Sequence, residues 1–207
     1  MSIKIRKAKA EDASFLAKMI LQSSRAEKKF GLFDLIFESK SDEDTLKMLE
    51  KLTITTSKNY CHYSNFLIAN IDGVDVGSLC SYEPRIATQK AFTDSLDEIG
   101  CAGSVDAFLE ISSICTFESN NRTLFFDFME ELDGYMDVGV LKALMQKTLL
   151  TARLKGYRIV QTMVEIGSLE ALLYYKKLGF KEIEEKECEL YKEKFGRAGL
   201  VLLAYEF

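Results

Sequence analysis

The succession of strand-like and helix-like patterns along the chain limits its fold more than any other feature of the sequence. Residues 2–7 alternate apolar and polar side chains, as a half-buried strand does. Asp12 then precedes apolar residues at helical spacing and is suited to cap that helix. A second amphipathic stretch, residues 25–52, is interrupted near Gly31 and Ser41. The first part of the chain therefore predicts one strand followed by helices.

A hairpin is predicted next. Residues 65–69 and 74–81 suit two strands, and Asp72-Gly73 between them favours a tight turn. Residues 85–100 favour a helix after the single proline, Pro84. Residues 103–122 mix apolar side chains with Ser, Asn and Thr, so both a helix and a loop stay open for them.

The C-terminal half continues the alternation. Its predicted elements are strand 124–132 with a turn at Asp133-Gly134, helix 140–156 closed by Gly156, strand 158–164, a helix capped by Ser168 that runs to Lys177, and strands 181–190 and 200–207. This order predicts an α+β or mixed α/β fold with a partly antiparallel sheet. The 207 residues contain no repeat and no low-complexity linker, so a single domain over residues 1–207 is expected.

Composition excludes several classes of function. The five cysteines are an odd number without Cys-x-x-Cys spacing, which favours reduced thiols in the cytoplasm over a disulfide framework or a zinc site. His62 is the only histidine, so a multi-histidine metal site is excluded. A net charge of −5 argues against nucleic acid as the main partner. No apolar run reaches the ~20 residues of a membrane helix, so no membrane partner is expected.

Several C-terminal motifs resemble those of one enzyme family. Residues 171–180, Ala-Leu-Leu-Tyr-Tyr-Lys-Lys-Leu-Gly-Phe, are similar to the segment A-x-x-L-Y-x-x-L-G-F of the GNAT N-acetyltransferase superfamily. Residues 139–145 resemble the start of that family's acetyl-CoA helix, and residues 154–159 resemble its exit into the next strand. Gly77 stands where the family's early hairpin carries a glycine. The match is ungapped over about residues 124–181 and weaker before them.

This resemblance implies a central twisted mixed sheet flanked by helices, and acetyl-CoA as cosubstrate without a metal. Two parallel strands would splay apart to admit the pantetheine arm, and a helix N-terminus would hold the pyrophosphate. The positions that the resemblance assigns to acetyl-CoA are Met129 and Glu131 through their backbone, Val138, Gly139, Val140, Leu141 and Lys142 at the helix start, and Ser168.

The predicted phosphate loop departs from the family pattern [Arg/Gln]-x-x-Gly-x-[Gly/Ala]. Met136 stands at the Arg/Gln position, Asp137 places a carboxylate near the expected pyrophosphate, and Leu141 replaces the last small residue. Gly139 alone is kept. A like charge near a phosphate weakens its binding, so the motifs predict the fold more strongly than the cosubstrate.

The resemblance also assigns two catalytic roles. Tyr175 aligns with a tyrosine that protonates the departing thiolate, and Asp127 lies in the strand where relatives carry an acidic residue facing the substrate. Apolar neighbours of Asp127 would raise its pKa toward that of a useful base. Glu130 and Glu131 are alternative bases, and an ordinary packing role stays open for Tyr175.

Three functions follow as hypotheses. The first is acetyl transfer from acetyl-CoA to a primary amine of a small molecule or peptide, directly within a ternary complex. The second is a GNAT-like module that has lost acyl-CoA binding and binds a partner, and the third is a transferase that uses another acyl donor. Dimers are common in this family, so the resemblance also allows a homodimer.

Overall fold

A seven-stranded mixed sheet organises the computed structural model, which describes residues 2–101, 105–120, 122–136 and 138–207. The strands are β1 (Ile3–Lys7), β2 (Phe66–Ile71), β3 (Val74–Tyr82), β4 (Thr123–Glu131), β5 (Ile159–Glu165), β6 (Lys181–Glu187) and β7 (Gly199–Glu206). Their order in the sheet is β1-β2-β3-β4-β5-β7-β6. Only β4 and β5 pair in parallel among these neighbours; the other pairs are antiparallel. The predicted mixed α/β architecture is confirmed.

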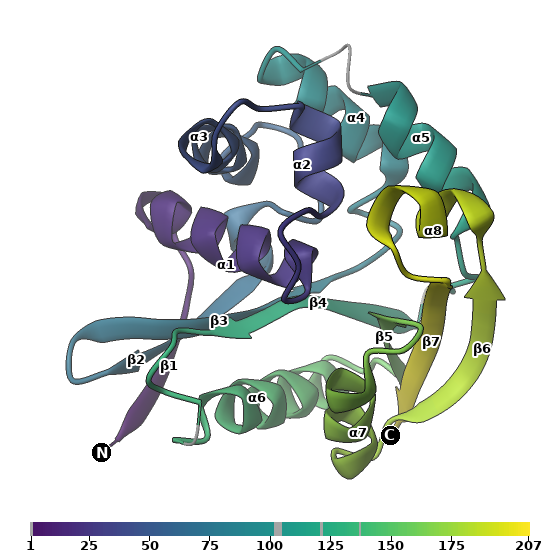
Figure 1. Cartoon of the computed structure of the whole chain (residues 1–207). Helices are drawn as coiled ribbons and strands as arrows, with labels where there is room; N and C mark the ends of the chain where they lie inside the picture. Colours follow the sequence, from purple (N-terminus) through teal and green to yellow (C-terminus); the bar gives the residue numbers. More distant parts are fainter. Residues whose placement is uncertain (1, 102–104, 121, 137) are drawn as a thin grey trace.

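Helices cover both faces of the sheet (Figure 1). Above it in that view lie α1 (Ala13–Arg25), α2 (Leu32–Phe37), α3 (Asp42–Thr53), α4 (Gln89–Glu98), α5 (Val105–Ile114) and α8 (Glu189–Phe195). Below it lie α6 (Val140–Leu154) and α7 (Leu169–Lys177). We call these two sides the upper and the lower face of the sheet.

Local signals in the sequence predicted most of these boundaries. Asp72 and Gly73 have φ of 51° and 90° and form the turn between β2 and β3, as an Asp-Gly hairpin requires. The break near Gly31 separates α1 from α2, and Ser41 caps α3 by accepting a hydrogen bond from Asp44 N. Within the undecided segment 103–122, residues 105–114 form α5. Residues 102–104 and 121 lie outside the described residues.

The predicted strand 181–190 is wrong at its end. β6 stops at Glu187, and α8 begins at Glu189, within the last residues of the predicted strand. Cys188 caps this helix because its Sγ accepts a hydrogen bond from Tyr191 N at 3.4 Å. Phe195 is then buried at the end of the helix. The apolar residues after Glu187 therefore pack at helical rather than strand spacing.

The lower face holds one continuous apolar cluster. It contains Val140, Leu144 and Met145 of α6 packed against strand residues such as Phe126 and Leu203. Gly77 permits this close approach, because a Cβ atom there would lie 2.7 Å from Val140 Cγ1. Helix α6 is thereby fixed directly beneath the centre of the sheet.

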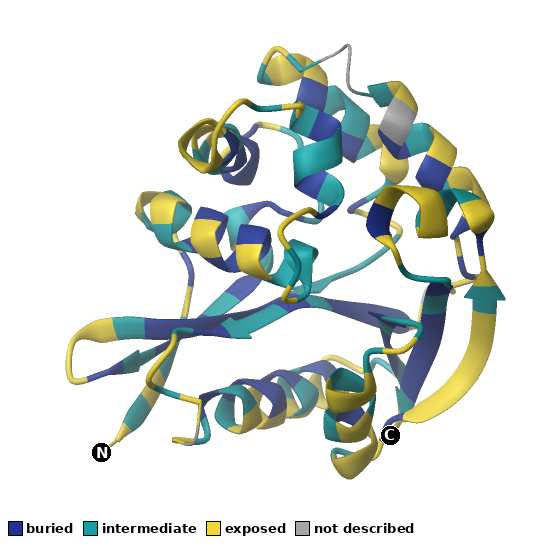
Figure 2. Cartoon of the chain, in the orientation of Figure 1, coloured by how far each residue is buried: buried dark blue, intermediate teal, exposed yellow. Residues whose placement is uncertain are grey.

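The upper face holds three separate apolar clusters. The aromatic cluster includes Phe92, Phe108 and Phe128 among its buried side chains. The thiol cluster consists of Ile111, Cys115, Cys188 and Phe195, and the strand cluster consists of Phe117, Phe125 and Leu202. Figure 2 shows the central strands buried, whereas β6 at the sheet edge is mostly exposed. The charges of β6 protect that edge from pairing with another chain.

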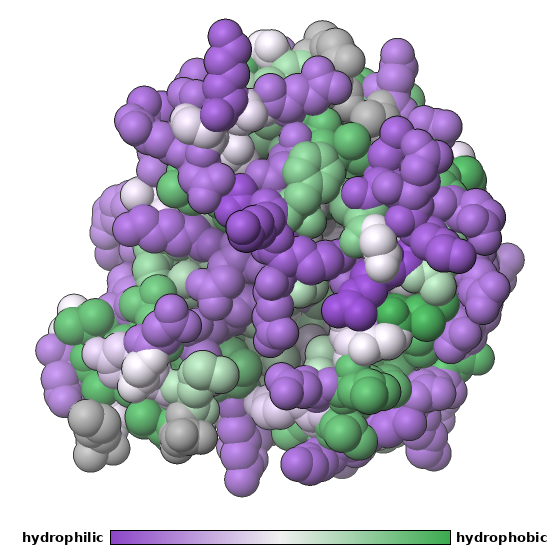
Figure 3. Space-filling model, viewed as in Figure 1, coloured by the Kyte–Doolittle hydropathy of each residue, from purple (hydrophilic) through white to green (hydrophobic). Residues whose placement is uncertain are grey.

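The face seen in Figure 3 is mostly hydrophilic. Elsewhere in the molecule, Leu169 and Leu173 of α7 are exposed hydrophobic side chains. Single exposed leucines are common in globular proteins, so these two define no site by themselves.

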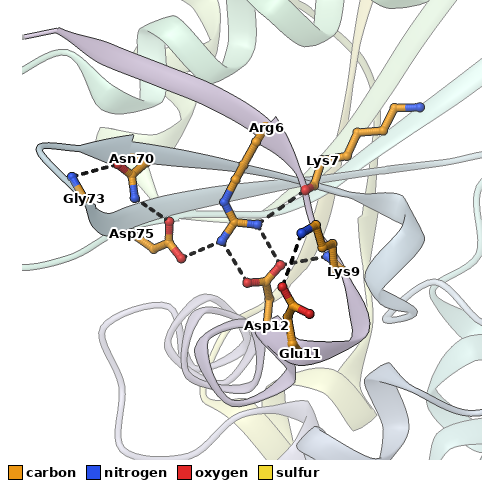
Figure 4. A network of polar contacts seen from close by, with 8 residues as sticks. All are labelled: Arg6, Lys7, Lys9, Glu11, Asp12, Asn70, Gly73 and Asp75. Carbon is orange, nitrogen blue, oxygen red and sulfur yellow. Dashed lines mark hydrogen bonds and ion pairs between the residues drawn. The ribbon is translucent and has the colours of Figure 1, made fainter.

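A polar network ties β1 to the first helix and the hairpin (Figure 4). Arg6 Nη1 and Nη2 donate to the two oxygens of Asp12 at 2.8 Å each, and Nη2 also donates to Asp75 at 2.6 Å. Asn70 donates to Asp75 at 2.9 Å. Asp12 occupies the residue before α1 as predicted, yet its carboxylate binds Arg6 and Lys9 N rather than capping that helix.

Candidate active site

Strand β4 carries one extra residue at its centre. Cys80 of β3 pairs with Asp127, and Ser78 pairs with Glu130, so two steps along β3 match three along β4. Phe128 lies at this bulge with φ of 43°, a left-handed conformation that is rare for a bulky residue. Bulges bend a strand and redirect its side chains. Phe128 accordingly packs with Cys80 in the aromatic cluster of the upper face.

The parallel strands β4 and β5 separate after a short ladder. Their pairing joins Thr123 to Ile159, Leu124 to Val160 and Phe125 to Gln161, and it ends there. The remainder of β4 continues to pair with β3, and the remainder of β5 continues to pair with β7. The edges that face one another beyond this ladder therefore offer backbone donors and acceptors to an extended ligand.

Helix α6 begins beneath the end of β4, where Val140 lies against Gly77, the partner of Glu131. Gly139 precedes it with φ of 87°, and the first helical bond runs from Ala143 N to Gly139 O at 3.0 Å. The amides of Val140, Leu141 and Lys142 stand ahead of that bond, in the first turn, where helix amides lack intrahelical partners. Such a terminus attracts anions.

The side chains of this loop contribute little to an anion site. Met136 is 71% exposed and Val138 is 36% exposed, whereas Val140 is buried against β3. Leu141 is half-buried and Lys142 points into solvent. Asp137, the carboxylate predicted to oppose a pyrophosphate, lies outside the described residues.

Asp127 is a half-buried carboxylate on the upper face. Its Oδ1 accepts a hydrogen bond from Phe128 N at 2.8 Å. Burial raises its pKa to about 6, and the amide bond offsets part of that rise. The charge of this carboxylate also raises the pKa of six nearby phenols and thiols, although burial is the larger cause for each of them: Tyr60, Cys61, Cys80, Tyr82, Tyr175 and Tyr191. Asp127 therefore lies among phenols and thiols contributed by segments far apart in sequence.

Tyr175 belongs to α7 and is buried on the lower face. Its ring lies 5.2 Å from that of Phe180, edge to face. Burial raises its pKa strongly, a hydrogen bond with Thr162 lowers it, and Asp127 raises it further. Thr162 lies in β5, just beyond the end of the β4–β5 ladder. The structure thus brings Tyr175 and Asp127 to the same gap in the sheet, one from below and one from above.

The residues after the bulge differ in their surroundings. Burial raises the pKa of Glu130 to about 7, although Ser23 and Gln22 bind its carboxylate, the latter at 3.0 Å. Glu131 is buried, and its carbonyl oxygen accepts from Gln22 Nε2 at 3.3 Å. Met129 packs against the lower cluster. Glu130 therefore joins Asp127 as a carboxylate of β4 whose pKa is raised toward neutrality.

A second polar group lies at the far end of β5. Glu165 accepts from Lys28 Nζ at 2.5 Å and from Tyr191 Oη at 3.0 Å, and Arg197 Nε lies 3.5 Å from its other oxygen. Lys28 also donates to Phe195 O at 3.3 Å. The segment between α1 and α2 is thereby joined to α8 over the end of β5. Sequence reasoning missed this group, and the position of Glu165 at a strand end is the signal that could have found it.

Ser168 and His62 are the remaining residues named from the sequence. Ser168 precedes α7 as predicted, but its side chain makes no capping bond. His62 is buried and its Nδ1 lies 2.7 Å from Ser64 Oγ. Among the described residues, no group of three or more His, Cys, Asp or Glu could hold a metal ion. Within the same residues, no helix has the length and hydropathy needed to cross a bilayer.

Sequence comparison finds no matching family model and no similar curated protein. Structural comparison is informative. A crystal structure described as an acetyltransferase matches with TM-score 0.70 at 17% identity over 98% of both chains. An N-acetyltransferase from Staphylococcus aureus Mu50 matches with TM-score 0.70 at 16% identity, covering 98% of this chain and 100% of that one.

More distant matches carry related names. A ribosomal-protein-alanine N-acetyltransferase from Brucella melitensis matches with TM-score 0.55 at 16% identity over 99% of both chains. Identities this low establish the fold and leave the activity to separate argument. The resemblance inferred from the C-terminal motifs is confirmed at that level: the chain has the fold of the GNAT acetyltransferases.

Proposed function

We propose that this protein is an N-acetyltransferase that transfers an acetyl group from acetyl-CoA to a primary amine of a small molecule or peptide. The observation that carries the proposal is the gap between β4 and β5, with Asp127 above it and Tyr175 below it. Acetyl-CoA supplies the activated thioester. Everything else that the reaction needs is a binding cleft, a proton acceptor and a proton donor.

The described residues fit most of acetyl-CoA. The free edge of β4 around Met129 and Glu131 suits the amides of a pantetheine arm, which would pair with it like an added strand. The first-turn amides after Gly139 suit the pyrophosphate, with Val138 and Lys142 beside them. Ser168 at the start of α7 is a further contact. The weak point is the loop itself, where Met136 and Val138 offer no charge to the phosphates.

Asp127 is the proposed base. An amine enters from the upper face as an ammonium ion and gives a proton to the Asp127 carboxylate, directly or through a water molecule. The neutral nitrogen then forms a bond to the carbonyl carbon, the bond from that carbon to sulfur breaks, and the nitrogen gives its second proton to water to leave the neutral amide. A carboxyl pKa of about 6 leaves the base ionised at neutral pH while it still binds a proton better than an exposed aspartate does.

Tyr175 is the proposed acid. Its hydroxyl lies on the lower side of the same gap and keeps its proton at neutral pH, as any phenol does, while burial raises its pKa further. In the proposed step it donates that proton to the departing sulfur and regains one from solvent. Glu130 is the alternative base, since its pKa is raised to about 7 and it follows the bulge on the same strand.

Turnover of acetyl-CoA with a panel of amines tests these roles. Asp127→Asn is expected to lower kcat/KM by about 10²–10⁴-fold and Tyr175→Phe by about 10²-fold, with acetyl-CoA binding retained. Tyr174→Phe is the matched control, because it removes a neighbouring phenol of the same helix. Equal rates for Tyr175→Phe and Tyr174→Phe would remove Tyr175 from the mechanism.

A binding module on the same fold is the second candidate. The observation that favours it is the absence of a basic side chain among the described residues of the loop 132–139, where Met136 lies exposed. In that case acetyl-CoA would not bind at millimolar concentration, and no amine would be acetylated.

A transferase that prefers another acyl-CoA would instead show faster turnover with that donor in the same assay.

A further inference from the structure

Glu131 presents its backbone to the side of β4 that faces away from β3. Leu132 N donates to Val76 O at 2.8 Å, which makes Leu132 and Val76 a hydrogen-bonded pair of this antiparallel ladder. Glu131 and Gly77 are the neighbouring pair in register. Hydrogen-bonded and non-hydrogen-bonded pairs alternate along such a ladder, so the amide and carbonyl of Glu131 point away from β3. That side is the gap, because the pairing of β4 with β5 ends at Phe125.

Gln22 of α1 binds this carbonyl group. Its Nε2 donates to Glu131 O at 3.3 Å and to the Glu130 carboxylate at 3.0 Å. A side-chain amide nitrogen carries two hydrogens, and these two acceptors use both of them. The Glu130 carboxylate therefore orients the amide of Gln22, and the amide covers the carbonyl that β4 presents to the gap.

The side chain of Gln22 can leave this position while its helix stays in place. Gln22 itself is exposed. Leu16, Met19 and Ile20 of the same helix are fully buried and hold α1 against the upper face of the sheet. An exposed amide that turns into solvent replaces its protein hydrogen bonds with bonds to water, so each bond lost shifts an equilibrium by only about two- to tenfold.

A strand-like ligand in the gap would compete with Gln22. In the proposed function, the amide groups of the pantetheine arm pair with the edge of β4. Such a ligand approaches Glu131 O from the open side of the strand, which is also the side from which Gln22 Nε2 binds it. One of the two donors then has to give way to the other.

We propose that Gln22 closes the donor site of the ligand-free protein and that the pantetheine arm displaces it. This inference rests on the proposed function and adds a regulation of the same site. A change that draws Gln22 away from β4 tightens donor binding without adding any contact to the donor. The nucleotide end of acetyl-CoA is assigned to the start of α6, so Gln22 opposes the pantetheine arm alone.

Calorimetric titration of the full chain with acetyl-CoA tests this role. Gln22→Met keeps the length of the side chain and removes its hydrogen-bond donor, so it should bind acetyl-CoA about three- to tenfold more tightly than the wild type. Gln89→Met is the matched control, because Gln89 is an exposed glutamine of α4 whose Nε2 donates to Ser112 Oγ at 3.2 Å. This control should bind acetyl-CoA as the wild type does.

A shorter ligand separates the two ends of the donor. The probe is 3′-phosphoadenosine 5′-diphosphate, the part of CoA that lacks pantetheine. It should bind equally to the wild type, Gln22→Met and Gln89→Met. Heteronuclear NMR of the glutamine side-chain amides follows the displacement itself: the signals absent from Gln22→Met should shift in the wild type on addition of acetyl-CoA and stay in place on addition of the nucleotide.

The outcomes separate this inference from the proposed function. Equal acetyl-CoA affinity of the wild type and Gln22→Met, or weaker binding by the variant, would overturn the closing role of Gln22 and keep the transferase. An equal gain for the nucleotide probe would also overturn it, because the effect would not concern pantetheine. Acetyl-CoA binding to neither protein would reject the proposed function, and the closing role with it.

Discussion

The two faces of the sheet are built for different tasks. The lower face has one continuous cluster in which α6 packs directly on the strands, close enough that Gly77 has no room for a side chain. The upper face has three clusters around Asp127, with carboxylates at 127, 130 and 165 among its aromatic side chains. Continuous apolar packing stabilises a fold, whereas buried charge with few partners destabilises it.

This difference indicates a division of labour. The lower face fixes α6 and α7, and with them the helix N-terminus and Tyr175. In the proposed function, the unfavourable groups of the upper face serve a ligand, as such groups commonly do in functional sites. Apart from Tyr175, substitutions below the sheet should therefore affect stability, and substitutions above it should affect activity and the pH dependence of stability.

The largest effect on stability is expected from the lower cluster. Leu144→Ala removes a side chain with 0% exposure from the centre of α6 and should lower the free energy of unfolding by about 3 kcal/mol. Leu150→Ala is the matched control on the same helix, because Leu150 is 53% exposed. Urea denaturation would measure both. Equal losses for the two variants would contradict a continuous lower core.

The upper face should gain stability when its carboxylate is removed. Folded Asp127 keeps its proton up to about pH 6, whereas the unfolded residue loses it near its ordinary value of 3.8. The folded state thus binds more protons in this interval, and stability falls as pH rises through it. Asp127→Asn should therefore raise the free energy of unfolding at pH 7.5 by on the order of 2 kcal/mol, with little change at pH 3.5.

Denaturation at both pH values measures this gain, and an increase of the same size at both would show that the charge is not its cause.

The rate of the wild-type protein should also depend on the protonation of Asp127. If Asp127 is the base, kcat/KM should rise as pH increases through about 6. A flat profile there would favour another group.

The smallest effect is expected at the sheet edge, outside both faces. The hydrogen bonds from Arg6 lower the pKa of Asp12, so its stabilising effect is present above pH 3.8 and is lost as pH falls through the lowered pKa. Asp12→Asn should cost about 1 kcal/mol at pH 7, since Arg6 is partly exposed. The cost should shrink under strongly acid conditions. A growing cost in acid would refute the assigned ion pair.

Much of the fold follows from local signals in the sequence. Asp72-Gly73, Gly139, Gly156 and Ser41 mark boundaries that the structure keeps, because each satisfies a local backbone requirement. Helix α8 was missed because its residues 189–195 mix apolar and charged side chains over only two turns. Its helical state depends on burial of Phe195 and on the cap at Cys188, which are tertiary features.

The candidate site was predictable only in part. Resemblance supplied Asp127, Tyr175 and the start of α6, and the first two lie on opposite sides of the gap between β4 and β5. Tyr60, Tyr82 and Tyr191 carry no motif, and they meet Asp127 only after folding. The bulge at Phe128 is equally invisible in sequence, because no glycine marks its positive φ. Contacts between distant segments decide such features, and a single sequence does not contain them in readable form.

Calorimetric titration of the purified protein with acetyl-CoA, with CoA as comparison, tests the central claim most directly. The account predicts micromolar binding, because it proposes that the gap between β4 and β5 holds the pantetheine arm and that the first-turn amides of α6 hold the pyrophosphate. No detectable binding at millimolar acetyl-CoA would contradict it, and the fold would then serve a binding module that no longer uses an acyl donor.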